Sequence, residues 1–468
     1  MGSTTTSRLQ RRAHGCGGDG GGAEPPVDID VSVDVKDLGS GRTGPRSAAS
    51  LPWGLGGELT VDRRTAALAD AEDPLGHLRA AFSLPEEVIY LDGNSLGALQ
   101  PAVAERLRSV IDGEWGRGLI RSWNDAGWVE LPRRVATRLA PLLGASTSEL
   151  AVTDSTSANL FKALAAARQL RPDRRVLLTD DANFPTDVYV AHGLAELTGD
   201  LEVRVVPTYE VADHLDEQVA AMTLTHVDYR TGRRHDAASL TAAAHDVGAL
   251  AVWDLSHSVG ALDVALDAWG ADLAVGCTYK YCNGGPGSPG FLYVASRWHD
   301  RATSPVRGWF GHARPFAFDL GYQPAEGAER FLDGSPPILS MAALETALEV
   351  FEGVDVAALE ARAAELTGLF IQLVDERIGP EVEIVTPRAP TERGAHVSIR
   401  HEEADALTQA LITRGVIGDH RPPDLVRFGF APLYTTRVEV VDAVEQLADL
   451  LASGAWDHDD FRRQRTVT

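Results

Sequence analysis

The most constraining feature of this sequence is an alternation, between about residues 174 and 295, of short apolar runs with segments of helical spacing. The apolar runs end in polar residues or turn signals, and they are RRVLLTDD, LEVRVVP, AMTLTHVDY, GALAVWDLSH, ADLAVGCTYK and GFLYVA. Continuous apolar runs of this length are typical of strands buried on both faces. Strands separated by helices predict an α/β fold, in which a mainly parallel sheet carries helices on both faces.

Polar side chains close several of these runs. In a parallel sheet, ligands bind in the crevice at the carboxyl ends of the strands. The candidates for a functional site are therefore Asp181, Thr225, Asp254, His257, Tyr279 and Lys280.

Lys280 is notable because lysine is scarce in this chain. Among 43 basic residues, only Lys36, Lys162 and Lys280 are lysines. A lone lysine usually carries solvated surface charge, but arginine performs that task elsewhere in the chain, and arginine neither loses its proton nor forms an imine. Lys280 ends an apolar run, where desolvation lowers the pKa of an amine, and the GGPG that follows allows close approach of a ligand. We therefore interpret Lys280 as a nucleophile.

Asp254 closes the preceding apolar run in VWDLSHSVG, and His257 follows it by three residues. An aspartate in this position can simply cap a helix. Because a buried carboxylate needs a cationic partner, the alternative is a counter-ion for a pyridinium nitrogen. A lysine that forms a Schiff base and an acid that keeps the ring protonated are the pair that a pyridoxal cofactor requires, and we favour this interpretation.

A phosphate site is predicted at VTDSTSANLFKALAAA, where an apolar run ends in hydroxyl residues and a helix begins. Thr156 and Ser157 fall at the helix N-terminus, where free amides favour an anion, although the same residues also suit ordinary capping. The stretch NFPTD adds Asp187 and Phe184, an aromatic side chain able to stack on a pyridine ring. By itself, a phenylalanine in a loop indicates only core packing.

Composition and apolar spacing together predict a tail and the boundaries of two domains. Residues 1–60 are rich in Gly, Asp, Pro and Ser, and we expect a disordered tail there because they bury too little apolar area. We expect residues 61–115 to contribute to a small domain and to the active site, and residues 116–340 to form a large domain. Residues 341–468 begin with a long helical stretch and continue with VEIVTP, AHVSIR and LVRFGFAPLYTT, which predicts a small α+β domain.

The net charge of −24 argues against nucleic acid and anionic membrane surfaces as partners. No apolar stretch approaches the roughly 20 residues of a membrane span. Cys16, Cys277 and Cys282 are too few and too irregularly spaced for a disulfide framework or a zinc site, and we expect no metal. A small-molecule substrate and a reducing, cytoplasmic location fit best. We expect no export signal, because no apolar segment follows the N-terminal arginines.

Several motifs together resemble the kynureninase family of pyridoxal-phosphate (PLP) enzymes, which has the fold-type I architecture of the aminotransferase superfamily. From about residue 65 onwards, the matching stretches are YLDGNSLGALQP, WGRGLIRSWNDAGW, VTDSTSANL, NFPTDVY, WDLSHSVGALDV, DLAVGCTYKYCNGGPGSPGFLYV, GWFGH and RFLDGSPPILS. The resemblance implies a large PLP-binding domain, a smaller α+β domain, and a homodimer whose subunits share the active site.

The resemblance also implies roles for particular residues. Lys280 would bind PLP covalently, Asp254 would pair with the ring nitrogen, and Phe184 would stack on the ring. The other implied cofactor contacts are Thr156, Ser157, Asp187, Thr225, His257, Tyr279, Ser335 and, from the neighbouring subunit, Trp309. The implied substrate contacts are Arg427, whose fork would grip a carboxylate, Ser95 and Trp115.

The implied reaction is hydrolytic cleavage of the Cβ–Cγ bond of L-kynurenine or 3-hydroxy-L-kynurenine, giving anthranilate or 3-hydroxyanthranilate and L-alanine. Lys280 would take the Cα proton, and Tyr279 would either donate a proton to the alanine fragment or bond the phosphate. One alternative is a cysteine desulfurase-like or aminotransferase-like enzyme, although Cys277 and Cys282 lie too close to the lysine for a mobile catalytic thiol. A second alternative is a protein of the same fold that binds a ligand or regulates another protein without catalysing a reaction.

Overall fold

A seven-stranded sheet in the order β2-β8-β7-β6-β5-β3-β4 forms the centre of the fold. The computed structural model describes residues 61–462. Neighbouring strands from β7 through to β4 pair in parallel, whereas β8 runs antiparallel to both β7 and β2. The strands are Leu150–Val152 (β2), Val176–Asp180 (β3), Glu202–Val206 (β4), Val219–Thr225 (β5), Leu250–Asp254 (β6), Leu273–Gly276 (β7) and Phe291–Val294 (β8). The predicted mainly parallel sheet is therefore confirmed.

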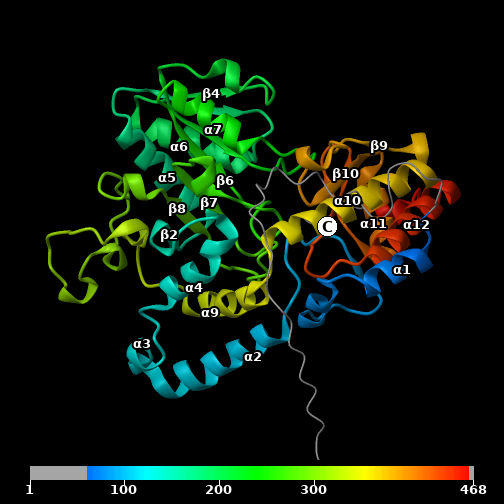
Figure 1. The fold of residues 1–468 in the computed structure, drawn as a ribbon, viewed down its shortest axis with the longest axis horizontal. Helices are drawn as coiled ribbons and strands as arrows, with labels where there is room; N and C mark the ends of the chain where they lie inside the picture. The colour runs from blue at the N-terminus through cyan, green and yellow to red at the C-terminus, as the bar shows by residue number, and fades with distance from the viewer. Residues whose placement is uncertain (1–60, 463–468) are drawn as a thin grey trace, which may run out of the picture. The chain divides into compact units, whose positions relative to one another are not determined.

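Helices cover both faces of this sheet (Figure 1). In β6, Leu250 and Val252 belong to one apolar core, which also contains residues of α5 and α6, whereas Ala251 and Trp253 belong to another, which also contains residues of α4 and α7. Successive side chains of a strand point to opposite faces, so a strand buried on both sides must be apolar throughout. These helices, with the short α8, are Leu131–Leu139 (α4), Thr156–Leu170 (α5), Pro185–Thr198 (α6), Ala237–Asp246 (α7) and Leu266–Trp269 (α8).

A second, four-stranded antiparallel sheet has the order β12-β13-β10-β9. Its strands are Glu383–Ile384 (β9), His396–Arg400 (β10), Asp419–Arg421 (β12) and Leu425–Gly429 (β13). Residues of α10, α11 and α12 share an apolar core with it, and Figure 1 shows these helices beside β9 and β10. The helices are Val356–Arg377 (α10), Ala404–Thr413 (α11) and Arg437–Ser453 (α12). The helix before them, Ile338–Ala347 (α9), packs instead in a core of the large sheet. The expected helical stretch after residue 340 is thus two helices, interrupted near Gly353, which has a φ of +75°.

The segment before the large sheet also packs against the C-terminal elements. It contains Arg63–Ala71 (α1), Ile89–Tyr90 (β1), Pro101–Ser109 (α2) and Ser122–Asp125 (α3). Strand β1 pairs in parallel with Val416–Ile417 (β11). Helix α2 continues into a wider, π-helical segment at Val110–Gly118.

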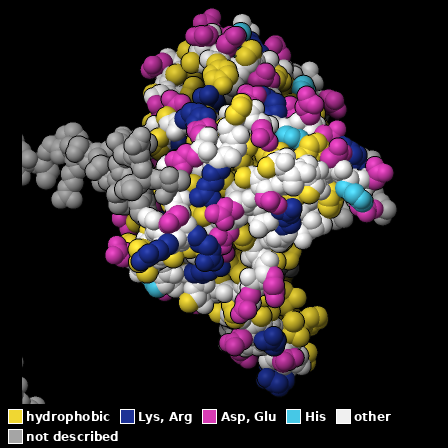
Figure 2. All heavy atoms as spheres, turned by 90° about the vertical axis from the view of Figure 1, so that its right-hand side faces the viewer, with side chains coloured by type: hydrophobic (Ala, Val, Ile, Leu, Met, Phe, Trp, Pro, Cys, Tyr) yellow, Lys and Arg dark blue, Asp and Glu magenta, His cyan; other side chains and the backbone are white. Residues whose placement is uncertain are grey.

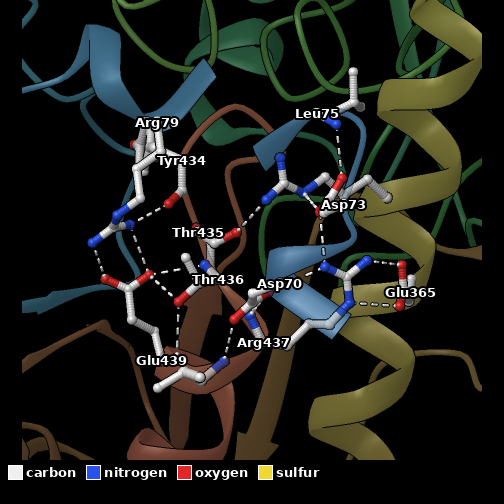
Figure 3. Close-up of polar contacts among 12 residues, drawn as sticks. Asp70, Asp73, Leu75, Arg79, Glu365, Tyr434, Thr435, Thr436, Arg437 and Glu439 are labelled. Carbon is white, nitrogen blue, oxygen red and sulfur yellow. Dashed lines mark hydrogen bonds and ion pairs between the residues drawn. The ribbon is translucent and has the colours of Figure 1, made fainter. Parts of the chain in front are cut away.

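A buried ion-pair network holds this N-terminal segment in place (Figure 3). Arg437, at the start of α12, donates from Nε and Nη2 to both carboxylate oxygens of Glu365 at 2.7 and 2.6 Å, and from Nη1 to Asp73 Oδ2 at 2.7 Å. Asp70 accepts from the backbone amide of Arg437 at 2.9 Å, and Arg362 lies 3.1 Å from Asp73. The chain then runs from this network to β1 and the GNSLG turn.

The expected disordered tail, residues 1–60, lies outside the described residues, and the expected domain boundaries stay predictions. Within residues 61–462 no helix is long and apolar enough to cross a membrane. Acidic and basic side chains are interspersed over the face in Figure 2.

Candidate active site

A cavity of about 620 Å³ opens at the carboxyl ends of β5 and β6 and beside the segment that follows β7. Its wall contains ten of the residues singled out from the sequence. They are Thr156, Ser157, Phe184, Asp187, Thr225, Asp254, His257, Tyr279, Lys280 and Ser335. Parallel pairing explains the convergence, because Thr225 lies opposite Asp254 and Asp254 opposite Val275 in the sheet register.

Lys280 lies four residues beyond the end of β7. Its Nζ is 2.7 Å from His257 Nε2. Burial lowers the pKa of Lys280, as desolvation does for any ammonium group. Burial also lowers the pKa of His257, and its Nδ1 is buried without a hydrogen-bond partner among the described residues. The pair therefore favours a neutral imidazole beside an amine that deprotonates more readily than an exposed lysine.

Two buried acids, Asp254 and Asp187, lie in the same wall. Asp254 is the last residue of β6, and its Oδ1 accepts from the Ser256 amide at 2.6 Å. Asp187 is in the first turn of α6, and Thr225 Oγ1 donates to its Oδ2 at 3.5 Å. Burial raises the pKa of both acids, and the neighbouring Asp254 raises that of Asp187 further. These shifts favour the protonated, neutral acids, and the charge of a protonated Lys280 opposes the shifts.

The N-terminus of α5 forms a different part of the wall. Ser155 caps the helix by accepting from the Ala158 amide, which places Thr156 and Ser157 in the first turn. The first amides of a helix have no partner within it, so they can bind an anion. A Cβ added to Gly290 would lie 3.1 Å from the Thr156 nitrogen, so this glycine keeps the approach to that amide open.

Phe184 and Tyr229 form an aromatic edge of the cavity, with ring centroids 5.1 Å apart and planes nearly perpendicular. Tyr229 was not selected from the sequence. It ends the apolar run AMTLTHVDY, four residues beyond Thr225, so its position in that run was the available signal.

Arg427 and Ser95, the expected substrate residues, contact each other, with Arg427 Nη2 donating to Ser95 Oγ at 2.8 Å. Asp419 holds the same guanidinium through Nε at 2.8 Å and Nη2 at 2.6 Å. Arg427 Nη1 donates to the Tyr229 carbonyl at 2.6 Å, which joins this cluster to the cavity wall. Asp419 was missed because only the register of β12 with β13 places it opposite Arg427.

Trp309 and Trp115 lie away from the cavity wall. Trp309 packs against Phe316 and Phe318 at centroid distances of 5.4 and 6.4 Å, and Trp115 is 57 % exposed. Trp123 is half-buried and packs against Trp128 and Trp309. The functional roles given to Trp309 and Trp115 stay predictions. Among residues 61–462, no group of three or more His, Cys, Asp or Glu side chains is arranged to hold a metal ion.

Comparison with known proteins identifies the family. A family model described as "Kynureninase C-terminal domain" matches residues 359–447. Kynureninase from Pseudomonas fluorescens is 50 % identical over 406 residues, which cover 85 % of this chain and 98 % of the relative. The chain belongs to the kynureninase family. Kynureninase from Burkholderia mallei (strain SAVP1) is likewise 50 % identical, over 87 % of this chain and 99 % of the relative.

Solved structures of other proteins share the fold of this kynureninase-family chain. A cysteine desulfurase from Thermococcus onnurineus NA1 matches with a TM-score of 0.68 and 20 % identity, covering 81 % of this chain and 98 % of the other. A variant of the cystine C–S lyase C-DES, solved with glycine covalently linked to its PLP cofactor, has a TM-score of 0.70 and 17 % identity, covering 79 % and 99 %. At these identities the likeness shows the shared fold.

Proposed function

We propose that this protein hydrolyses L-kynurenine, 3-hydroxy-L-kynurenine or both to anthranilate or 3-hydroxyanthranilate and L-alanine, with PLP held by Lys280. The observation that carries the proposal is the position of Lys280, half-buried in the cavity wall with its pKa lowered by desolvation, in the same wall as the acid that ends β6. Membership of the kynureninase family supports this reaction and substrate class.

The cavity residues suit PLP in three respects. The first turn of α5 offers amides and hydroxyls to a phosphate, through Thr156 and Ser157. The buried acids Asp254 and Asp187 suit a protonated ring nitrogen, whose positive charge would oppose the effect of burial and favour an ionised carboxylate. His257 Nδ1 is buried and has no hydrogen-bond partner within residues 61–462, so it is available to a bound group. When bound, PLP supplies an electron sink for the charge left at the substrate Cα.

Lys280 Nζ is the base that removes the Cα proton once substrate is bound. Burial favours its neutral form, which is the form that accepts a proton. His257 Nε2, 2.7 Å away, orients this nitrogen without adding a positive charge, since burial keeps the imidazole neutral.

Tyr279 adjoins Lys280, and the Lys280 Nζ lies 6.0 Å from the centre of its ring. Burial raises the pKa of the Tyr279 phenol, so the hydroxyl stays protonated and can donate. A protonated phenol suits either a donor to the alanine fragment or a hydrogen bond to phosphate.

The guanidinium of Arg427 is the proposed partner of the substrate carboxylate. Its bonds to Asp419, Ser95 and the Tyr229 carbonyl use Nε, both Nη2 hydrogens and one Nη1 hydrogen. A guanidinium has five N–H groups, so one Nη1 hydrogen is left for a ligand. Asp419 fixes the plane of the fork and thereby the direction of that hydrogen.

A desulfurase-like activity is the second candidate, because desulfurases share the fold. A reactive thiol must be exposed and readily deprotonated. Cys277 and Cys282 are both buried, and burial raises the pKa of each thiol. Neither has the properties of a catalytic thiol, which favours the kynureninase activity. A binding protein without catalysis is a third candidate, but it would not require the buried amine.

The functional unit that we propose is a cytoplasmic homodimer with a shared active site. Apolar side chains that are more than half exposed support a second copy, among them Leu119, Ile120 and Phe318. Leu119 and Phe318 also have positive φ values of 53° each, a conformation that non-glycine residues rarely adopt without surrounding contacts.

The proposal is tested by incubating the purified, PLP-loaded chain with L-kynurenine or 3-hydroxy-L-kynurenine. We expect release of the aminobenzoate, followed by fluorescence, and an equal amount of alanine. Lys280→Arg keeps a positive charge but forms no imine, and we expect it to lower the rate by about 10³-fold or more. The proposal fails if neither substrate is cleaved, or if Lys280→Arg retains the wild-type rate. Sulfide release from L-cysteine would favour the desulfurase-like alternative.

A further inference from the structure

Lys162 is a second lysine in this arginine-rich chain, and it lies in the interior. It belongs to α5, six residues after Thr156, and it is only 1 % exposed. A buried ammonium group is costly unless each of its hydrogens has an acceptor. The acceptors around the Lys162 ammonium group therefore indicate the role of this residue.

Three acceptors surround the Lys162 ammonium. Nζ donates to Asp154 Oδ2 at 2.5 Å and to the Phe331 carbonyl at 2.9 Å, and it lies 2.8 Å from Asp333 Oδ2. An ammonium group has three N–H donors, so this set satisfies all of them. An arginine fork has a different shape and does not match three acceptors around one nitrogen.

Two of these acceptors belong to the cavity wall or to its supports. Asp154 lines the cavity, immediately before the turn that leads to Thr156, and its φ of +45° is rare for a residue with a Cβ. Asp333 lies two residues before Ser335, which lines the cavity, and its carbonyl accepts from the Phe310 amide at 3.0 Å. Lys162 thus ties the start of α5 to the segment that carries Ser335.

The positive charge of Lys162 matters for an anion bound in this cavity, because it offsets the negative charge of Asp154. Although burial acts to raise the pKa of Asp154, hydrogen bonds from Lys162 and Asp333 lower it on balance, so Asp154 is ionised. The pKa of Asp333 is raised to about 6, mainly by burial and also by the interaction of its carboxyl group with that of Asp154. Without the ammonium group, a carboxylate would face the cavity beside Thr156 and Ser157, where it would repel a phosphate.

We propose that Lys162 is a positioning residue for the phosphate end of this cavity, neutralising Asp154 and holding the Asp154 turn in the conformation that presents the first amides of α5. This inference rests on the proposed PLP function. It concerns the protein before PLP binds, since all the contacts described exist without the cofactor.

The test compares binding of PLP, pyridoxal and inorganic phosphate by apoprotein, titrated through changes in absorbance and intrinsic fluorescence. We expect Lys162→Met to weaken PLP and phosphate binding by about 10- to 100-fold, the size expected for an unneutralised charge close to an anion. Pyridoxal lacks the phosphate, so its binding should change by less than about threefold, because its bond to Lys280 does not depend on this charge. Equal losses for PLP and pyridoxal, or wild-type affinity for PLP, would overturn the inference.

A double variant separates charge from folding. Lys162→Met combined with Asp154→Asn removes both charges, and we expect it to regain most of the preference for PLP over pyridoxal. If Lys162→Met alone is unfolded by circular dichroism, the double variant decides the matter: loss of that preference in folded protein contradicts neutralisation of Asp154. Failure of the wild-type chain to bind PLP at all would instead refute the proposed function.

Discussion

At the scale of single residues, burial controls the chemistry of this site. Lys280 and His257 have lowered pKa values, whereas Asp187 and Asp254 have raised ones, and desolvation is the largest cause in each case. Desolvation favours the neutral form of every group, so the same environment favours a free amine and protonated acids. The free amine is the form of lysine that can form an imine, and a cation bound beside the acids would favour their ionised form.

Asp92 and Asp419 extend this argument to stability, because their pKa values are shifted in opposite directions. Burial raises the pKa of Asp92 to about 7, and its Oδ1 is buried without a hydrogen-bond partner in the part of the chain that the structure describes. Folded protein therefore holds a proton on Asp92 that the unfolded chain releases, so the stabilising contribution is complete below about pH 4 and is lost as pH rises to about 7. We expect Asp92→Asn to increase the free energy of unfolding at pH 8 and to change it little at pH 4, as measured by urea denaturation.

Asp419→Asn is the matched control, with the opposite sign. Burial acts to raise the pKa of Asp419, but Arg427 and Arg421 lower it on balance. A lowered pKa stabilises the folded state above the ordinary value and loses that effect as pH falls. We expect Asp419→Asn to destabilise the protein at pH 8. If Asp92→Asn is destabilising at pH 8 as well, the account of Asp92 is wrong.

At the scale of elements, the ion-pair network of Figure 3 joins α1, α10 and α12. Arg437 is 8 % exposed in its side chain and satisfies Glu365, Asp73 and Asp70 together. Removing it leaves these carboxylates without their common cation. We expect Arg437→Met to lower the free energy of unfolding by about 3–5 kcal/mol, the usual cost of breaking a buried pair.

The control for Arg437 is Arg63, which pairs with Asp442 at 2.9 Å but is 65 % exposed in its side chain. An exposed pair contributes only about 0–1 kcal/mol, so Arg63→Met should change the unfolding free energy little. Both variants are compared by urea denaturation at one ionic strength. Equal effects of the two substitutions would show that burial of the network does not govern its contribution.

At the scale of the whole molecule, the proposed homodimer predicts that exposed apolar side chains meet a second copy. Ile120 is 77 % exposed, and a carboxylate in its place would be desolvated at an interface. We expect the wild-type chain to sediment as a dimer and Ile120→Asp to weaken the dimer at least about tenfold.

Leu197→Asp provides a comparison of similar exposure at another place. Leu197 is 73 % exposed on α6, which packs against β4 at the edge of the large sheet. This variant should remain a dimer. A wild-type monomer, or equal dissociation of both variants, would contradict the proposed assembly.

The sequence by itself determined the α/β architecture, and it predicted a lysine and an acid that the structure places in the wall of one cavity. Strands β3 and β5 to β8 follow the apolar runs, because strands buried on both faces must be apolar throughout. Strand β4 also lies on a predicted run, but it is at the edge of the sheet and only its last residue, Val206, is buried. Lys280 and Asp254 were recognisable because each ends such a run, and a parallel sheet brings those ends together whatever the details of packing.

Only the tertiary structure decided which distant residues support the site. Asp419 faces Arg427 through strand register, Tyr229 reaches the cavity beyond the end of β5, and Lys162 gathers acceptors from separate segments. Local patterns report the burial of a residue and the element to which it belongs. Partners separated by many residues depend on register and on the packing of elements against one another, and neither leaves a periodic signal in the sequence.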